Sequence, residues 1–230
     1  MKLSIIIPCK NEERYIGKLF SAIQKQRLPK NVEIIVDDAD STDKTPLIIS
    51  AYSHVLPIKK VSGGLPSVGR NNGAEVAKGD VLLFLDADTT FEDPELIRES
   101  LIKIQEGNEL VGALLSIKNN SFIRFLYFLS NMVMRFSKLE KPFVVGAYFM
   151  ITKEAFERLG GFDESLMHCE DYFLSREISN KKFAIINKYI YTDDRRFKKM
   201  GKLGMARYFF FNILQRNNKK AFKKDIGYWS

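Results

Sequence analysis

The stretch Leu82-Leu83-Phe84-Leu85-Asp86-Ala87-Asp88-Thr89 decides the fold of this 230-residue chain. Its leading residues are all apolar, which is typical of a strand inside a sheet that is covered on both faces. Asp86 and Asp88 follow at the carboxyl end of this strand, where open α/β sheets bind ligands. Because side chains alternate along an extended chain, both carboxylates lie on one side. Such a pair suits Mg²⁺ or Mn²⁺ bridging a diphosphate, although an Asp-x-Asp triplet alone is also common in solvated loops.

Apolar, strand-like segments alternate with helical segments from the N-terminus to about residue 117. We expect strands at residues 3–7, 32–36, 55–61, 81–85 and 109–117, and helices at residues 12–26, 44–53 and 67–77. A further helix is expected to begin at Asp93-Pro94-Glu95, with Asp93 as its N-cap. The alternation predicts an α/β fold with a largely parallel, doubly wound sheet.

The pattern changes after residue 117. Apolar residues recur there at helical spacing, and they are Phe122, Phe125, Leu126, Leu129, Met132, Val133 and Phe136. One interpretation is a helix packed on the core through this face; the other is an interfacial helix that touches a membrane or an apolar acceptor. Downstream, we expect a strand at 143–151, a short helix capped by Thr152, and a helix at about 169–178.

The formal net charge is +8, and the segment from residue 195 to 224 carries many basic and aromatic residues without any acidic one. This mixture fits anionic lipid headgroups or a phosphorylated lipid, and a merely solvated face is an equal alternative. Nucleic acid fits on charge alone, but no recognised nucleic-acid-binding motif supports it, so we expect none.

Two cysteines give no disulfide framework, and no run of about 18 apolar residues predicts a spanning helix. The chain starts directly with a strand, so we expect no signal peptide and a cytoplasmic protein, peripheral at the cytoplasmic face of a membrane.

Five motifs follow one another in a fixed order. They are Pro8 followed by Lys10-Asn11-Glu12-Glu13, the acidic turn Asp37 to Asp43, Gly63-Gly64 before Arg70, Asp86-Ala87-Asp88, and Gly160-Gly161-Phe162-Asp163 with Glu170-Asp171 beyond it. This ordered set covers at least residues 3–196 and resembles the family 2 glycosyltransferases of GT-A fold. The resemblance implies a Rossmann-like, mostly parallel central sheet flanked by helices, with a C-terminal helical extension. It also implies a donor-binding half at residues 1–117, an acceptor-binding half at 118–194 and a basic, aromatic helical tail at 195–230.

The activity that this resemblance implies is inverting, metal-dependent transfer of a sugar from a UDP- or GDP-sugar. The acceptor is expected to be a polyprenyl-phosphate, another lipid-linked molecule or a glycan. Asp171 is expected to be the catalytic base and Glu170 to orient the acceptor or the base. If the acceptor is itself a phosphate, no base is needed, and the acidic pair orients the acceptor instead.

The resemblance assigns further residues to the donor and the metal. Those expected to bind the donor nucleotide are Pro8, Asp38, Asp40, Arg70, Asp86, Arg195 and Arg196, and those expected to bind Mn²⁺ or Mg²⁺ are Asp88 and Asp86. Ala39 replaces an aspartate of the family's usual turn, so Asp37, Asp38 and Asp40 all stay candidates for the base contact, with Asp38 favoured. Gly146 and Ala147 are expected near the donor sugar. His168 is either a metal ligand or, as lone histidines more often are, structural.

Two other classes of protein remain open. A nucleotidyltransferase uses a similar carboxylate and metal site but usually carries a glycine-rich loop after its first strand, which Pro8-Cys9-Lys10-Asn11 lacks. A non-catalytic protein that binds lipid or nucleic acid through its basic surface would leave Asp86, Asp88 and Asp171 without a role.

Overall fold

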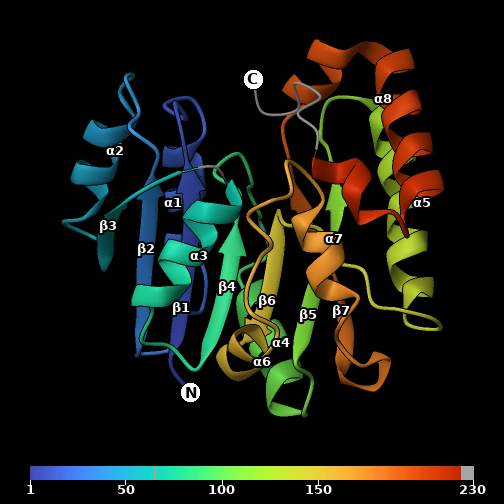
Figure 1. Cartoon of the computed structure of the whole chain (residues 1–230). Helices are drawn as coiled ribbons and strands as arrows, with labels where there is room; N and C mark the ends of the chain where they lie inside the picture. The colour runs from blue at the N-terminus through green and yellow to red at the C-terminus, as the bar shows by residue number, and fades with distance from the viewer. Residues whose placement is uncertain (65, 224–230) are drawn as a thin grey trace.

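The computed structural model describes residues 1–64 and 66–223, without the side chains of residues 196, 202, 203, 206, 209 and 213. Seven strands form one sheet in the order β3-β2-β1-β4-β6-β5-β7 (Figure 1). Their bounds are β1 Leu3–Cys9, β2 Val32–Asp38, β3 Ile58–Ser62, β4 Val81–Leu85, β5 Leu110–Ser116, β6 Tyr148–Thr152 and β7 Phe183–Tyr191. Only β6 runs antiparallel to its neighbours. The predicted mostly parallel α/β sheet is therefore confirmed.

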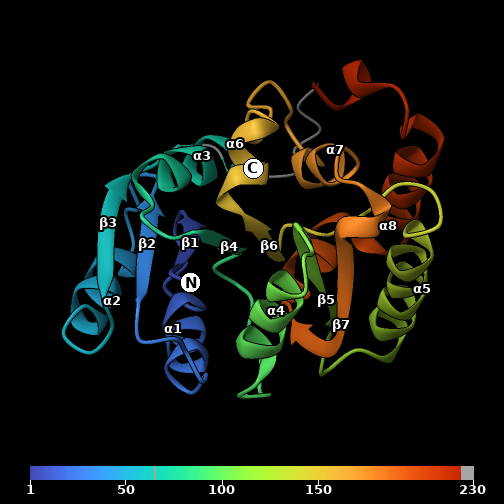
Figure 2. The same ribbon diagram turned by 90° about the horizontal axis from the view of Figure 1, so that it is seen from below.

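Helices cover both faces of the sheet (Figure 2). Their bounds are α1 Ile16–Gln24, α2 Thr45–Tyr52, α3 Pro66–Val76, α4 Leu96–Gln105, α5 Ser121–Ser137, α6 Lys153–Arg158, α7 Glu170–Ser175 and α8 Arg195–Gln215, with short 3-10 helices at Asn180–Lys182 and Lys219–Lys223. Helices α1, α2 and α4 pack on one face of the sheet, and α3, α6 and α7 pack on the other. Helices α5 and α8 lie beside each other near β7 in both views.

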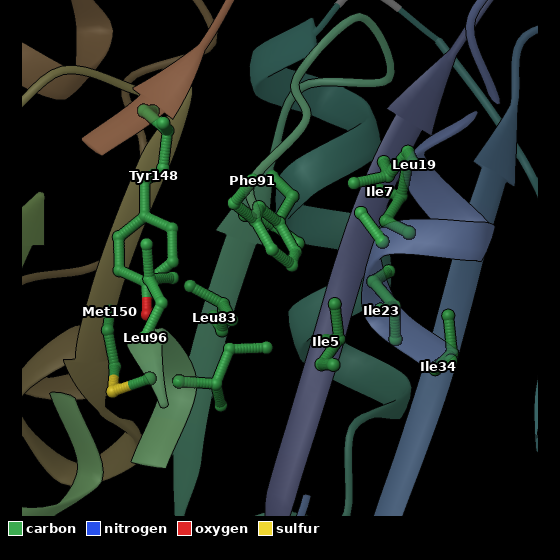
Figure 3. Packing of buried hydrophobic residues seen from close by; sticks show 14 of the residues in the cluster. Ile5, Ile7, Leu19, Ile23, Ile34, Leu83, Phe91, Leu96, Tyr148 and Met150 are labelled. Atoms are coloured by element: carbon green, nitrogen blue, oxygen red, sulfur yellow. The ribbon is translucent and has the colours of Figure 1, made fainter. Parts of the chain in front are cut away.

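The core forms on both faces because the central strands β1 and β4 carry buried apolar side chains on both sides. Ile5 and Ile7 of β1 point toward Leu19 and Ile23 of α1 (Figure 3). Ile6, the residue between them, packs with the opposite cluster under α3. A strand that is buried on both faces needs such a continuous apolar run, as the sequence of β1 predicted.

Several expected boundaries were wrong. The strand expected at 143–151 is confined to β6, which inserts between β4 and β5, and β7 was not predicted. Helix α4 begins at Leu96 rather than at Asp93, because the Asp93 carboxylate accepts a hydrogen bond from the Glu95 amide at 2.9 Å and closes a turn before the helix. Helix α1 likewise begins at Ile16 rather than near Glu12.

The topology brings distant segments to the carboxyl ends of the parallel strands. Cys9 at the end of β1 is in register with Asp38 at the end of β2. Leu85, the last residue of β4, pairs with Tyr148, the first of the antiparallel β6. The residues just before β6 therefore lie beside Asp86. Because β6 sits between β4 and β5, the predicted donor and acceptor halves share one sheet, and the boundaries at 117 and 194 stay a prediction.

Helix α5 packs on the protein through the face opposite to the predicted apolar one. Ile123, Asn131 and Met134 are its buried residues. The predicted apolar face is largely exposed, and its exposed large side chains are Phe122, Phe125, Leu129, Met132, Val133 and Phe136. Within the described residues, no helix is both long and apolar enough to cross a membrane.

Candidate functional site

Arg70 of α3 lies between two carboxylates that come from distant parts of the chain. Its side chain is only 2% exposed, and it donates one guanidinium hydrogen bond to Asp86 Oδ1 at 2.6 Å and another to Glu170 Oε1. Burial disfavours the charged guanidinium, but Asp86, Glu170 and Asp171 outweigh it and hold the pKa of Arg70 above its ordinary value. Arg70 therefore fixes the positions of the carboxylates, and its contact with a nucleotide stays a prediction.

Asp171 lies next to the Arg70–Glu170 ion pair and is held by backbone amides. Its carboxylate accepts hydrogen bonds from the amide of Gly146, just before β6, and from the amide of Tyr172 at 2.7 Å. A side chain at position 146 would place its Cβ 2.8 Å from Arg70 Nη2, so the guanidinium would have to move away from its present partners. Burial, reinforced by the neighbouring Glu170 carboxylate, raises the pKa of Asp171 to about 7. A carboxylate with a pKa near neutrality is suited to take up a proton in a reaction.

Asp88 contacts Arg195, the first residue of α8. Arg195 Nη2 lies 3.0 Å from Asp88 Oδ2, and the same guanidinium donates two hydrogen bonds to Glu12, at 2.8 and 2.6 Å. It also stacks on the Tyr15 ring at 5.0 Å. A positive group thus lies against the carboxylate expected to bind metal, and the expected contact of Arg195 with the donor stays a prediction.

Glu12 is a site residue that received no role from its sequence. Its side chain is 11% exposed and pairs with Arg195. Burial raises its pKa, against the opposing effect of that guanidinium. Two features of the sequence could have marked Glu12 as a site residue: its position soon after the first predicted strand and its place in the first of the five motifs. Arg196 lies in α8, but its side chain falls outside the described part of the structure.

The three aspartates that are candidates for the contact with the nucleotide base lie in different environments at the end of β2. Asp38 is buried and pairs with Lys60 at 2.8 Å; burial alone would raise its pKa, but Lys60 and Ser41 lower it. Asp37 is also buried, and burial raises its pKa to about 6. Asp40 is exposed and adopts a left-handed backbone with φ of 53°. Pro8 is half-buried at the end of β1, in register with Asp37.

A cavity of about 510 Å³ connects the carboxylates to the space between α5 and α8. Arg70, Asp86, Asp88, Glu170 and Asp171 line one end of it, together with Gly146 and Ala147. The structure thus brings the predicted catalytic pair, the predicted metal pair and the predicted sugar-binding residues to one cavity. Pro8, Asp38 and Asp40 are not among the residues that line it.

His168 does not join this cavity lining. It is fully buried, with its ring 5.6 Å from that of Tyr208 and 5.1 Å from that of Phe222. These aromatic contacts give His168 a structural role, which is the more common one for a lone histidine.

The donor set at the end of β4 fits a divalent ion that is shared with a substrate. No group of three or more His, Cys, Asp or Glu side chains suited to a metal occurs within residues 1–64 and 66–223. Mg²⁺, however, is usually bound by one or two carboxylates together with substrate phosphates and waters. Asp86 and Asp88 supply that number of hard oxygen ligands, and the Arg195 guanidinium beside Asp88 shows that this carboxylate accepts a cation.

Comparison with known proteins gives consistent matches. The sequence model described as glycosyl transferase family 2 matches residues 4–160. The poly(ribitol-phosphate) beta-N-acetylglucosaminyltransferase TarS of Staphylococcus aureus is 34% identical over 111 residues, which are 46% of this chain and 19% of TarS. The dolichol-phosphate mannosyltransferase of Pyrococcus furiosus is 35% identical over 114 residues, 48% of this chain and 32% of that protein. The chain thus spans less than a third of the length of these curated relatives.

Two solved structures show the same fold. A mannosyltransferase from Pyrobaculum calidifontis, in complex with GDP-Man and Mn²⁺, superposes with a TM-score of 0.68 at 19% identity, covering 90% of this chain and 64% of that one. S. aureus TarS residues 1–349 in complex with UDP-GlcNAc superposes with a TM-score of 0.64 at 23% identity, covering 84% and 58%. At these identities the likeness establishes the fold.

Proposed function

This chain belongs to glycosyl transferase family 2, and we propose that it transfers a sugar from a nucleoside-diphosphate sugar to an acceptor, with inversion and with help from Mn²⁺ or Mg²⁺. The family and the GT-A fold that the sequence resemblance implied are both confirmed. The chain covers only part of the length of its curated relatives, so the activity, the acceptor and the metal are all part of what we propose.

The observation that carries the proposal is the meeting of Asp86, Asp88 and Asp171 in one cavity. Inverting transfer is a single displacement: the acceptor oxygen bonds to the anomeric carbon while the bond from that carbon to the diphosphate oxygen breaks. The proton of an acceptor hydroxyl passes to Asp171, whose pKa of about 7 suits a base. Arg70 keeps Glu170 and Asp86 in place around the reacting groups.

Asp88 and Asp86 would hold the divalent ion, which when bound neutralises charge on the departing nucleoside diphosphate. Arg195 now pairs with Asp88 and Glu12, and its guanidinium fork also suits diphosphate oxygens. We expect Arg195, and Arg196 beside it, to contact the diphosphate once it is bound. Asp38 stays the expected contact of the nucleoside, together with Asp40 and with Pro8 of the neighbouring strand β1. UDP- and GDP-sugars are the expected donors, by analogy with the complexes of the solved relatives.

Calorimetric titration with UDP, GDP, CDP and dTDP tests this proposal. We expect one diphosphate to bind tightly only when Mn²⁺ is present, and Asp88→Ala to weaken that binding by about 100-fold, since even indirect partners of a metal typically contribute 10- to 100-fold. Asp80→Ala is the matched control, because Asp80 is exposed at the opposite end of β4. Failure of all four diphosphates to bind the wild type would contradict the proposal.

The acceptor belongs to one of two classes, a lipid-linked molecule or a glycan, and we propose that the protein works at a membrane surface. The exposed apolar residues of α5 carry this part of the proposal. Phe125 and Phe136 are 57% and 59% exposed. Exposed basic residues accompany them, namely Arg124, Lys138 and Lys141. An apolar helix face with neighbouring cations is typical of helices that lie in the interface of an anionic bilayer.

Replacing two of these phenylalanines tests the membrane contact. We expect Phe125→Ser/Phe136→Ser to reduce binding to vesicles of phosphatidylcholine and phosphatidylserine by at least tenfold, because each ring loses part of the roughly 1.5–3 kcal/mol of a fully buried phenylalanine. Vesicle flotation measures the bound fraction. Leu47→Ser is the control, since Leu47 is 71% exposed on α2, on another part of the molecule. Equal binding of both variants would contradict a contact through α5.

A further inference from the structure

The cavity that holds the carboxylates has a mainly apolar lining. Most of its remaining wall consists of aliphatic and aromatic side chains from α5, α8 and the segment before β6, with Ser130, Asn212 and Arg216 among the polar residues that interrupt it. A volume of about 510 Å³ lies within the range of roughly 300–1,000 Å³ that is usual for small-molecule sites. The site therefore has room for much more than the reacting atoms of an acceptor.

One wall is a single stripe of α5. Phe122, Leu126, Leu129 and Val133 follow each other at helical spacing and all line the cavity. They lie on a different side of the helix from the core-facing Ile123 and Met134. Phe122, Leu129 and Val133 remain 44%, 45% and 58% exposed, so the cavity opens along α5 rather than being closed by it.

The facing wall comes from the C-terminal part of the chain. Phe197 and Met205 of α8, and Phe222 beyond it, are buried and contribute apolar surface to the cavity. Phe197 packs edge-on against Tyr127 of α5, with ring centroids 5.8 Å apart, which ties the two helices together. An elongated apolar ligand would thus be enclosed by two helices, with one end near Asp171.

On the premise of the transferase activity proposed above, we infer that this part of the cavity binds the apolar chain of an amphiphilic acceptor. The polar head lies at Asp171, and the chain runs between α5 and α8 toward the exposed phenylalanines of α5. A glycan fits this wall poorly, because each hydroxyl placed against it loses its hydrogen bonds to water without gaining a partner. A lipid chain gains stability from the same wall, and it enters from the face that we expect to lie against the membrane.

Binding of amphiphiles of increasing chain length tests this inference. Butyl, octyl and dodecyl phosphate, and the neutral alkyl glucosides of the same lengths, are titrated below their micelle-forming concentrations with the preferred nucleoside diphosphate and Mn²⁺ present. We expect affinity in at least one series to rise by about fourfold for each methylene that enters the cavity, so roughly 250-fold between butyl and octyl. An affinity that does not change with chain length in either series would overturn the inference.

A bulky substitution shows where the chain lies. Ser130 is half-buried and lines the cavity from α5, so Ser130→Trp should fill it and lower the affinity for dodecyl chains at least tenfold. Ile102→Trp introduces the same residue on α4, where Ile102 is 39% exposed and does not line the cavity. This control should leave the affinity for dodecyl chains unchanged. Val133→Trp serves as a second cavity variant if Ser130→Trp fails to fold.

Nucleoside diphosphate binding on the same samples separates the two proposals. Chain-length dependence that persists in Ser130→Trp and Val133→Trp places the chain elsewhere and overturns the inference, while intact diphosphate binding leaves the transferase proposal standing. If no diphosphate binds but chain length still governs affinity, the transferase proposal fails and the apolar site is retained as a lipid site.

Discussion

Asp171→Asn is expected to lower kcat by about 10²- to 10⁴-fold, the usual contribution of a general base, while the fold and diphosphate binding persist. The Gly146 amide donates to Oδ2 of Asp171 and the Tyr172 amide donates to Oδ1, so asparagine, with its single side-chain oxygen, keeps one of these hydrogen bonds and loses the other, a local cost that we expect the fold to tolerate. The amide is neutral, however, and cannot take the acceptor proton. Initial rates with a hydroxyl acceptor, measured beside calorimetric diphosphate binding, separate the loss of the base from a loss of structure.

The pH dependence of the wild type gives the same residue a second test. Asp171 works as a base only when it is ionised, and its pKa is about 7, so kcat/KM should fall tenfold for each pH unit below about 7. Folding raises the pKa of Asp171 from 3.8 to about 7, so its contribution to folding stability is fully present below about pH 4 and is lost as the pH rises to about 7. Asp171→Asn should therefore remove this loss, so that its free energy of unfolding falls less than that of the wild type between about pH 4 and pH 7.

Asp80→Asn is the matched control for this variant. It makes the same change at an exposed residue that directly precedes β4, at the end of the strand away from Asp86. We expect it to keep the wild-type rate and pH profile. An unchanged kcat in Asp171→Asn would contradict the assignment of Asp171 as base and would favour an acceptor that arrives already ionised, such as a phosphate.

The sequence was sufficient to predict where several of the candidate carboxylates lie in the fold. An apolar run that ends in Asp86-Ala87-Asp88 predicts both a central strand and charged groups at its carboxyl end, because both follow from local pattern. The same reasoning placed Asp38 at the end of β2, and the structure confirms that position. These predictions required only the rule that parallel strands end at the same edge of a sheet.

Other features depend on contacts between distant residues, and no local pattern encodes them. Arg70 pairs with Glu170, 100 positions away, and Glu12 pairs with Arg195, 183 positions away. The antiparallel insertion of β6 is equally non-local, although it is what carries Gly146 to Asp171. The periodicity of α5 identified an apolar face, but periodicity alone does not tell a helix packed on a core from one that leaves this face exposed.

Arg70→Met is expected to destabilise the protein by about 3–5 kcal/mol, the usual effect of removing one partner from a buried ion pair. Glu170 is only 6% exposed and would keep a charge without its main partner, whereas Asp86, at 21%, is better hydrated. For a chain of this size, each kcal/mol lowers Tm by about 2–4 °C, so we expect a decrease of about 10 °C. Thermal unfolding followed by circular dichroism measures it.

The double variant Arg70→Met/Glu170→Leu should recover most of this loss, because replacing both members of a buried ion pair by apolar residues of similar volume is often nearly neutral for stability. Arg98→Met is the control, since Arg98 is 56% exposed and its pair with Glu95 should contribute only about 0–1 kcal/mol. A Tm for Arg70→Met within 2 °C of the Arg98→Met value would contradict the structural role. The guanidinium also lowers the pKa of Asp171, so Arg70→Met should move the acidic limb of the rate profile to higher pH, which a purely structural arginine would not do.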